Sequence, residues 1–418
     1  MTRYIFSEAS FSKVIRAGDS KRFNIDLAND RDSILKAAVT SAASKTIKFL
    51  PVYKTWIKGR ECISTKHYSA HLLFRSISKH LARLFQLSLP SRDQIVLGVI
   101  KTLSDRTPMY IVRRDISSFY ETLPLNSVRE KLLRNTRISL KVRYFIGLFF
   151  DSYCAEIGLP RGHVLSSVVA EVAMQEFDSA IKSIDGVYRY YRFSDDILLF
   201  SYRSPEKIIS AMNDHLPAGV KFNQSKSDAM SVDCFDKSKQ GLISFEFLGY
   251  KFTFSNLAKG SVQREVRVSI SDRKITKLKT RLILSLKKFK KDHNRGLLRD
   301  RLCFLSGNYR VQRKGLNAIK TSKYVKSGIF YSYRLCGTYS DAGTAPHDCD
   351  ELKRLDGFYS SLIRGKNSEF TLLLRAAFPQ PTYDDLRKIS FFKGYSIKRS
   401  VRFSASRVHE IKEVWRSA

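Results

Sequence analysis

The most informative pattern of hydrophobic and polar positions in the chain lies at residues 188–200, where two runs of aromatic and branched residues stand on either side of Ser-Asp-Asp. Such residues favour extended chain, and the polar tripeptide between them favours a tight turn. The pattern therefore predicts a β-hairpin that carries Asp195 and Asp196 at its tip.

An upstream strand pattern also ends in a carboxylate. Residues 109–115 form an apolar run that closes with Asp115, and a helical pattern begins near Ser127. Asp115 and Asp195 are 195 − 115 = 80 residues apart, enough for a helical hairpin and a return to the same sheet. Carboxylates brought together repel each other, and a shared proton or a hard cation such as Mg²⁺ relieves the repulsion. The alternative is a solvated Asp-Asp turn and an unrelated capping residue.

Helical patterns flank these strands. Residues 31–39 and 71–85 have helical periodicity, and residues 53–60 read as a basic hairpin. From 269 to 301 the chain is helical and strongly basic, with a predicted buried stripe of Ile275, Leu278, Leu282 and Leu286. Four lysines lie outside this stripe, as phosphate contacts or as a solvated face: Lys287, Lys288, Lys290 and Lys291.

Composition narrows the class of protein. The 418 residues include 74 Lys plus Arg against 39 Asp plus Glu, so the net charge is 74 − 39 = +35. Such a field attracts polyphosphates and makes binding depend steeply on salt. No apolar run reaches the roughly 18 residues that span a bilayer, and the N-terminus has no signal-peptide core, so we expect no membrane partner and a cytoplasmic protein. The six cysteines form no Cys-x-x-Cys pair, which argues against a zinc site or a disulfide framework.

Five segments, in order, resemble the motifs of reverse transcriptases. They read Asp-Ile-Ser-Ser-Phe-Tyr-Glu at 115–121, Gly-Leu-Pro-Arg-Gly at 158–162, Phe-Ser-Asp-Asp at 193–196, Val-Lys-Phe-Asn-Gln-Ser-Lys at 220–226 and Phe-Leu-Gly at 247–249. The wording is most similar to compact bacterial reverse transcriptases, in particular the defence-associated and abortive-infection (unknown-group) enzymes.

The chain departs from that bacterial pattern at two places. Arg161 replaces a Gln in the loop, which continues with Ser166-Ser167 instead of Ser-Pro. The hairpin begins with Phe193-Ser194 instead of Tyr and a small apolar residue. Both changes leave the carboxylates intact but weaken any transfer of detail about template handling.

The resemblance implies an α+β fold of the right-hand polymerase type. Fingers and palm, built from an antiparallel sheet plus helices, would be followed by a helical thumb and a C-terminal extension. The expected boundaries are 1–50 for an N-terminal extension, 51–260 for fingers and palm, 261–340 for the basic thumb and 341–418 for a C-terminal extension of unknown role.

The resemblance also implies roles for particular residues. Asp115, Asp195, Asp196 and the Ile116 carbonyl would hold two Mg²⁺ ions, with Mn²⁺ as a substitute, and Lys226 would support the pyrophosphate leaving group, unless it is an ordinary surface cation. The incoming nucleotide would contact Ile116, Phe119, Tyr120, Arg161, Gly162, Lys58 and Arg60. Primer and template would contact Phe247, Leu248, Gly249 and the four lysines at 287, 288, 290 and 291.

The expected function is RNA-directed DNA polymerase, making DNA from dNTPs by two-metal nucleotidyl transfer. The resemblance implies antiphage defence with an RNA template or an associated non-coding RNA, and with a protein partner or a second copy of the chain. Three alternatives stay open: a palm-fold RNA polymerase, a template-independent nucleotidyltransferase, and a non-catalytic nucleic-acid-binding protein. Tyr120 favours DNA synthesis, because a phenol ring beneath the sugar fills the volume of a 2′-hydroxyl, unless it is merely a core aromatic.

Overall fold

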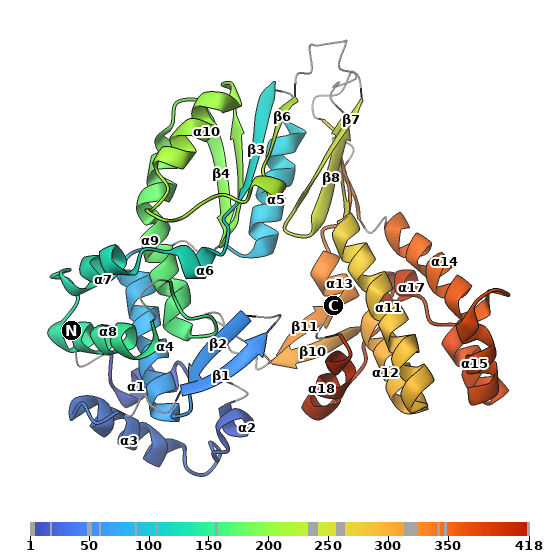
Figure 1. Cartoon of the computed structure of the whole chain (residues 1–418), viewed down its shortest axis with the longest axis horizontal. Helices are drawn as coiled ribbons and strands as arrows, with labels where there is room; N and C mark the ends of the chain where they lie inside the picture. The colour runs from blue at the N-terminus through green and yellow to red at the C-terminus, as the bar shows by residue number, and fades with distance from the viewer. Residues whose placement is uncertain are drawn as a thin grey trace. The chain divides into compact units, whose positions relative to one another are not determined.

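The structure is a computed structural model of the chain (Figure 1), and two compact units make up the fold. The first unit contains Met1–Pro90, Met109–Ser231 and Gln312–Tyr324, and the second contains Ser91–Pro108, Val232–Val311 and Val325–Ala418. The residues that the structure describes are 5–16, 19–47, 52–57, 60–87, 90–105, 107–154, 158–232, 241–255, 264–312, 324–340, 343–346 and 349–415.

The first unit is a four-stranded antiparallel sheet, a two-stranded hairpin and the helices around them. Its helices are α1 (Glu8–Ser12), α2 (Asp19–Phe23), α3 (Arg31–Ala43), α4 (Tyr68–Leu84), α6 (Phe119–Thr122), α7 (Leu125–Leu133), α8 (Leu140–Tyr153), α9 (Val164–Ser183), α10 (Pro205–Asp214) and the 3-10 turn η2 (Gln224–Lys226). Its strands are β1 (Val52–Ile57), β2 (Arg60–Thr65), β3 (Met109–Asp115), β4 (Val187–Phe193), β5 (Asp196–Ser201) and β6 (Asp228–Val232).

The four-stranded sheet has the order β4-β5-β3-β6, so β3 lies beside the hairpin made by β4 and β5. Helices α8 and α9 lie in the sequence between β3 and β4, and α9 packs against β4. Strand β5 is buried from Ile197 to Ser201, as its unbroken apolar run requires. The predicted hairpin, the predicted upstream strand and the return of the chain to the same sheet are therefore confirmed.

The core of the first unit joins the long helices to this sheet. An aromatic group at its centre brings Phe74 of α4 into edge contact with Phe149 and Tyr153 of α8, at centroid distances of 6.0 and 5.8 Å. These helices bury their apolar faces there because the residues recur three or four positions apart. The helices predicted at 31–39 and 71–85 are α3 and α4, and the hairpin predicted at 53–60 is β1 and β2.

A buried ion pair ties the N-terminal segment to α4. Arg75 donates to Asp19 Oδ1 at 2.9 Å and to Asp19 Oδ2 at 2.5 Å, and the Tyr68 hydroxyl donates to Asp19 Oδ2 at 3.0 Å. Burial raises the pKa of Asp19, but the Arg75 and Tyr68 hydrogen bonds outweigh it, so the pKa lies below its ordinary value. The segment predicted as an N-terminal extension therefore belongs to the core of the first unit.

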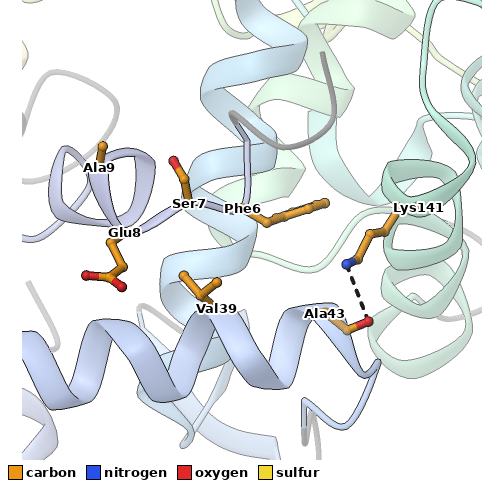
Figure 2. A pocket seen from close by; sticks show the side chains of 7 residues that line it. All are labelled: Phe6, Ser7, Glu8, Ala9, Val39, Ala43 and Lys141. Atoms are coloured by element: carbon orange, nitrogen blue, oxygen red, sulfur yellow. Dashed lines mark hydrogen bonds between the residues drawn. The ribbon is translucent and has the colours of Figure 1, made fainter.

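A pocket of about 680 Å³ opens among the N-terminal helices (Figure 2). Phe6, Val39 and Ala43 supply apolar walls, and the Lys141 ammonium donates to the Ala43 carbonyl at 3.4 Å while lying 5.7 Å from the Phe6 ring centroid. Ser7, Glu8 and Ala9 complete the lining. None of these residues belongs to the predicted site.

The second unit is built around a five-stranded antiparallel sheet of order β13-β12-β9-β8-β7. Its strands are β7 (Leu242–Phe247), β8 (Tyr250–Ser255), β9 (Val266–Ile270), β12 (Gly337–Ser340) and β13 (Gly343–Pro346), with a separate pair β10 (Asn308–Gln312) and β11 (Tyr324–Gly328). Its helices are α5 (Arg92–Ser104), α11 (Asp272–Asp292), α12 (Arg295–Ser306), α13 (Ile329–Tyr333), α14 (Asp350–Arg364), α15 (Glu369–Ala377), α16 (Gln380–Arg387), α17 (Phe391–Ser396) and α18 (Ala405–Glu413).

The basic helical segment is confirmed as α11 and α12, but its buried stripe differs from the prediction. Leu282 and Leu286 are buried together with Phe289, whereas Ile275 and Leu278 are only half-buried. The stripe therefore begins about two turns later than the spacing alone predicts.

Mixed helix and antiparallel sheet, in both units, is the α+β architecture that was expected. Among the described residues, no helix has the length and apolar character needed to cross a membrane. The described cysteines, Cys62, Cys154, Cys303, Cys336 and Cys349, are all free thiols.

Candidate active site

Asp115 and Asp196 face each other across two neighbouring strands of the first unit. The register of β3 and β5 pairs Asp115 with Asp196. One residue further along, the Ile116 N–H donates to the Asp195 carbonyl at 3.0 Å. Asp115 and Asp196 therefore form a non-hydrogen-bonded pair, the kind in which side chains approach most closely. Asp115 is 5% exposed, and Asp195 and Asp196 are half-buried. The structure pairs Asp115 with Asp196 and places Asp195 in the adjoining turn.

The hairpin tip is a two-residue loop, Ser194 and Asp195, in which Ser194 has a left-handed φ of +59°. Positive φ at this place suits the right-handed twist of a tight hairpin, but it costs a non-glycine residue about 1 kcal/mol or more. The Arg192 guanidinium donates to the Ser194 carbonyl at 3.2 Å and stabilises the turn.

Arg192 is itself fixed by two carboxylates of α9. It donates to Asp178 at 2.6 and 2.7 Å and to Glu171 at 2.7 Å, and only 6% of its side chain is exposed. Burial alone would lower the pKa of Arg192, but the Asp178 and Glu171 carboxylates raise it above its ordinary value. The Tyr190 hydroxyl donates to Asp178 at 2.7 Å and completes the network. Helix α9 therefore holds the turn that carries Asp195.

A third segment closes over Asp115. The Asn223 N–H donates to the Asp115 carbonyl at 2.7 Å, and the Asn223 amide nitrogen lies 3.4 Å from Asp115 Oδ2. The Ser117 N–H donates to the Lys221 carbonyl at 2.9 Å, so this segment is bound to the chain on both sides of Ile116. Asn223 was not predicted as a site residue, although its place three positions before Lys226 is the signal that could have identified it.

Tyr120 lies on α6, five residues after Asp115. Its ring meets the Phe119 ring edge to face at 5.3 Å. Burial raises the pKa of Tyr120 above its ordinary value. Phe119 is 3% exposed and belongs to the core, whereas Tyr120 is half-buried.

Arg161 makes an ion pair that the sequence did not predict. Its guanidinium bonds both carboxylate oxygens of Glu121, with Nη2 donating to Oε2 at 2.9 Å, and its Cζ lies 5.4 Å from the Tyr120 ring centroid. The Glu121 hydrogen bonds raise the pKa of Arg161 further above its ordinary value. The expectation that Arg161 lies against the base or phosphates of a nucleotide stays a prediction, and a ligand would have to compete with Glu121.

The loop at 158–162 fits tightly against its neighbours. Gly158 has a φ of +89°, and a Cβ there would lie 2.5 Å from the Glu121 carbonyl oxygen, so only glycine fits. Gly162 has a φ of +84° and is exposed, which leaves its backbone open to a ligand. The Ile63 N–H donates to the Arg161 carbonyl at 2.8 Å and binds the loop to β2.

His163 anchors the end of this loop and was given no role from the sequence. It lies within 4.7 to 4.8 Å, centroid to centroid, of Phe74, Phe149 and Tyr153, and its Nδ1 accepts from the Leu165 N–H at 3.2 Å, which caps α9. Burial lowers the pKa of His163 to about 3, so the ring is neutral. An isolated histidine between glycine and an apolar helix carries no sequence signal for such a role.

The carboxylates of Asp115 and Asp196 fit a hard cation. Both are oxygen donors placed at one point by strand register, and Mg²⁺ at phosphate sites takes one or two carboxylates and completes its shell with water and substrate oxygens. Among the described residues, no three His, Cys, Asp or Glu side chains gather closely enough to hold a metal ion by themselves. The ion and the Ile116 carbonyl ligand stay predictions.

Three of the predicted phosphate-binding cations cannot be placed. Lys58 lies outside the described residues, and Arg60 and Lys226 are described only in their backbone, in β2 and η2. Their roles stay predictions.

The residues predicted to contact primer and template lie in the second unit. The Phe247 side chain is 1% exposed and belongs to the core, while Leu248 and Gly249, at φ of +49° and +79°, form the turn between β7 and β8. Arg92 Nε donates to the Leu248 carbonyl at 2.7 Å. This turn is therefore structurally constrained, and its contact with nucleic acid stays a prediction.

The four lysines of α11 are exposed, as predicted, but one of them has a partner. Lys290 donates to Glu369 of α15 at 2.6 Å, whereas Lys287, Lys288 and Lys291 share one side of the helix by their spacing. The last three are the better candidates for contact with phosphates.

The chain matches no protein-family model and no curated protein. Solved structures that are similar include apo telomerase from Candida tropicalis truncated from its C-terminal domain, at 14% identity and a TM-score of 0.31, over 45% of this chain and 43% of that one. Another is telomerase from Candida albicans in complex with a fragment of telomeric RNA, at 12% identity and a TM-score of 0.32, over 82% of this chain and 53% of that one. The aligned parts span about half the length of either telomerase chain.

Proposed function

We propose that the chain is an RNA-directed DNA polymerase that adds dNTPs to a primer 3′-hydroxyl. The observation that carries the proposal is the pairing of Asp115 with Asp196 across β3 and β5, with Asp195 in the adjoining turn. Carboxylates held side by side on buried strands are electrostatically costly, and a site for cations and triphosphate explains them. The order of the five sequence motifs supports the same assignment as a polymerase.

In the proposed mechanism, the three carboxylates act as metal ligands. Asp115, Asp195 and Asp196 would hold Mg²⁺, which when bound acidifies a hydroxyl and neutralises phosphate charge. Asn223 and the Ile116 N–H orient the carboxylate-bearing backbone, because they bond the carbonyls of Asp115 and Asp195. The exposed Gly162 backbone gives room for the nucleotide, and Lys226 would support the departing pyrophosphate.

Tyr120 favours DNA synthesis over RNA synthesis, which is the second candidate function. Its ring is half-buried, five residues after Asp115, and a nucleotide sugar held near the paired carboxylates would meet the ring. A ring that fills this space excludes a 2′-hydroxyl sterically.

The test is primer extension on an RNA template with dNTPs and with rNTPs. We expect the parent protein to incorporate dNTPs and Tyr120→Ala to accept rNTPs better, by up to about 2 kcal/mol of relieved overpacking, or roughly 30-fold. A parent that prefers rNTPs would establish the RNA polymerase instead. Synthesis without a template would establish the nucleotidyltransferase, and inactivity in every format would leave the non-catalytic binding protein.

We further propose a role in bacterial antiphage defence with a dedicated non-coding RNA and a partner subunit or second copy. This rests on the wording of the sequence motifs. Sequencing of the nucleic acid that copurifies with the protein tests it, since one recurrent RNA is expected. A preparation that is monomeric, free of RNA and fully active on arbitrary primers and templates would contradict it.

A further inference from the structure

The Tyr120 ring is in contact with a neighbour on α6 and with the glycine loop. The Phe119 ring meets it at 5.3 Å with an interplanar angle of 70°, and the Arg161 guanidinium lies 5.4 Å from its centroid. The second contact comes from Arg161, one of the positions at which the sequence departs from the bacterial pattern.

Glu121 fixes the guanidinium that lies by this ring. An Arg paired with both oxygens of one carboxylate has its plane set by two parallel hydrogen bonds, which a single bond would not do. The side chains of Arg161 and Glu121 are 27% and 41% exposed, and a pair this accessible adds little to the stability of the fold. The geometry of the Arg161–Glu121 pair is instead suited to orienting a neighbouring side chain.

The backbone makes α6 and the glycine loop one rigid element. The Leu159 N–H donates to the Tyr120 carbonyl at 2.6 Å, and Gly158 has no room for a Cβ against Glu121. A shift of the loop would therefore carry Arg161 and the backbone of Tyr120 together, so the side-chain pair determines mainly the orientation of the ring.

We propose that Glu121 and Arg161 are a positioning pair that fixes the Tyr120 ring and thereby sets how strongly deoxyribonucleotides are preferred over ribonucleotides. This inference rests on the proposed polymerase function. It differs from direct contact between Arg161 and the nucleotide, in which Arg161 would act on both kinds of nucleotide alike.

The experiment compares kcat/KM for dNTP and rNTP incorporation in the parent, Glu121→Gln, Arg161→Gln, and each variant combined with Tyr120→Ala. Glu121→Gln keeps the shape of the side chain but removes the charge. The matched control is Glu176→Gln, which removes another exposed ion pair of the same unit, with Lys131 at 2.7 Å.

We expect each single variant to lower the dNTP to rNTP ratio by about fivefold, the scale of one partly exposed ion pair, and the control to leave it unchanged. In the Tyr120→Ala background, neither substitution should change the ratio further, because the ring through which the pair acts is gone.

Equal increases in KM for both nucleotides, with an unchanged ratio, would overturn the inference and leave Arg161 as a direct contact. A change of ratio that persists without the Tyr120 ring would also overturn it. Both results leave the proposed function intact, whereas a parent that incorporates no nucleotide would overturn the function and the inference together.

Discussion

At the scale of single residues, the register of β3 and β5 places Asp115 and Asp196 opposite each other. Like charges on a non-hydrogen-bonded cross-strand pair repel, so replacing one of them relieves that repulsion. The same carboxylates are what a cation and a triphosphate require. Stability and activity should therefore respond in opposite ways to their removal.

Asp195→Ala and Asp196→Ala should each lower the rate of nucleotide incorporation by about a thousandfold, since a lost metal ligand costs roughly 4 kcal/mol in the transition state. The melting temperature should stay the same or rise. Primer extension at several Mg²⁺ concentrations and thermal unfolding measure the two effects. Asp228→Asn, an exposed carboxylate of β6 near Arg113, is the control and should change neither. Parent-like incorporation by both alanine variants would rule out the polymerase.

His163 makes the stability of the first unit depend on pH. Its pKa is about 3 in the folded protein and about 6.5 in the unfolded chain, so between these values only the unfolded chain binds the proton. The unfolding free energy should therefore be highest above about pH 6.5 and fall as the pH falls, by about 2 kcal/mol at pH 5 from this residue.

His163→Asn tests this assignment, because asparagine can still cap a helix but does not titrate. The variant should be less stable than the parent at pH 7, and the gap in unfolding free energy between the two proteins should narrow at pH 5. Urea denaturation at both pH values gives the comparison. A gap that stays constant with pH would show that His163 does not carry the dependence.

At the scale of elements, the turn between β4 and β5 depends on a helix that the sequence pattern does not connect to it. Arg192 reaches Asp178 and Glu171 of α9 and the carbonyl of Ser194. A half-buried network of this kind is well satisfied as it stands. Removing its cation would leave two carboxylates near each other without a positive charge between them.

Arg192→Gln should lower the free energy of unfolding by about 3 kcal/mol and reduce nucleotide incorporation, because the carboxylates of α9 lose their charge partner and the turn loses its support. The control is Arg129→Gln, since Arg129 pairs with Asp151 at 2.8 Å and is 42% exposed; it should cost less than about 1 kcal/mol. Equal losses of unfolding free energy in the two variants, measured by urea denaturation, would show that the Arg192 network stabilises the fold no more than an exposed ion pair does.

The elements were predictable where one local pattern decided them. The runs at 109–115 and 188–200 predicted β3, β4, β5 and the place of all three aspartates, because strand-forming residues and turn residues are local signals. The pairs of Arg161 with Glu121, 40 residues apart, and of Asn223 with Asp115 were not predictable, since each depends on how distant segments meet. In α11 the periodicity predicts the helix correctly, but the residue at which its apolar face becomes buried depends on which elements pack against the helix.

At the scale of the whole molecule, the charge of +35 makes attraction to nucleic acid a property of the entire surface. Replacing an individual lysine should then change the affinity for nucleic acid markedly only where that lysine contacts a phosphate directly. Lys287, Lys288 and Lys291 are the candidates for such contact by exposure and spacing, whereas the charge of Lys290 is paired with Glu369, whose pKa the Lys290 hydrogen bond lowers.

Replacing Lys287, Lys288 and Lys291 with Gln should weaken binding of a primer-template duplex and flatten its dependence on salt, because each lost phosphate contact removes about 0.9 from the slope of log K against log salt. Lys290→Gln is the matched control on the same helix turn and should change the slope much less, since its charge is already paired. Binding isotherms at four or five salt concentrations measure both slopes. Sequence preference should not change, because phosphate contacts carry no base information. If the triple variant and the control give the same slope as the parent, α11 does not contact the duplex, and the basic surface acts only through its overall field.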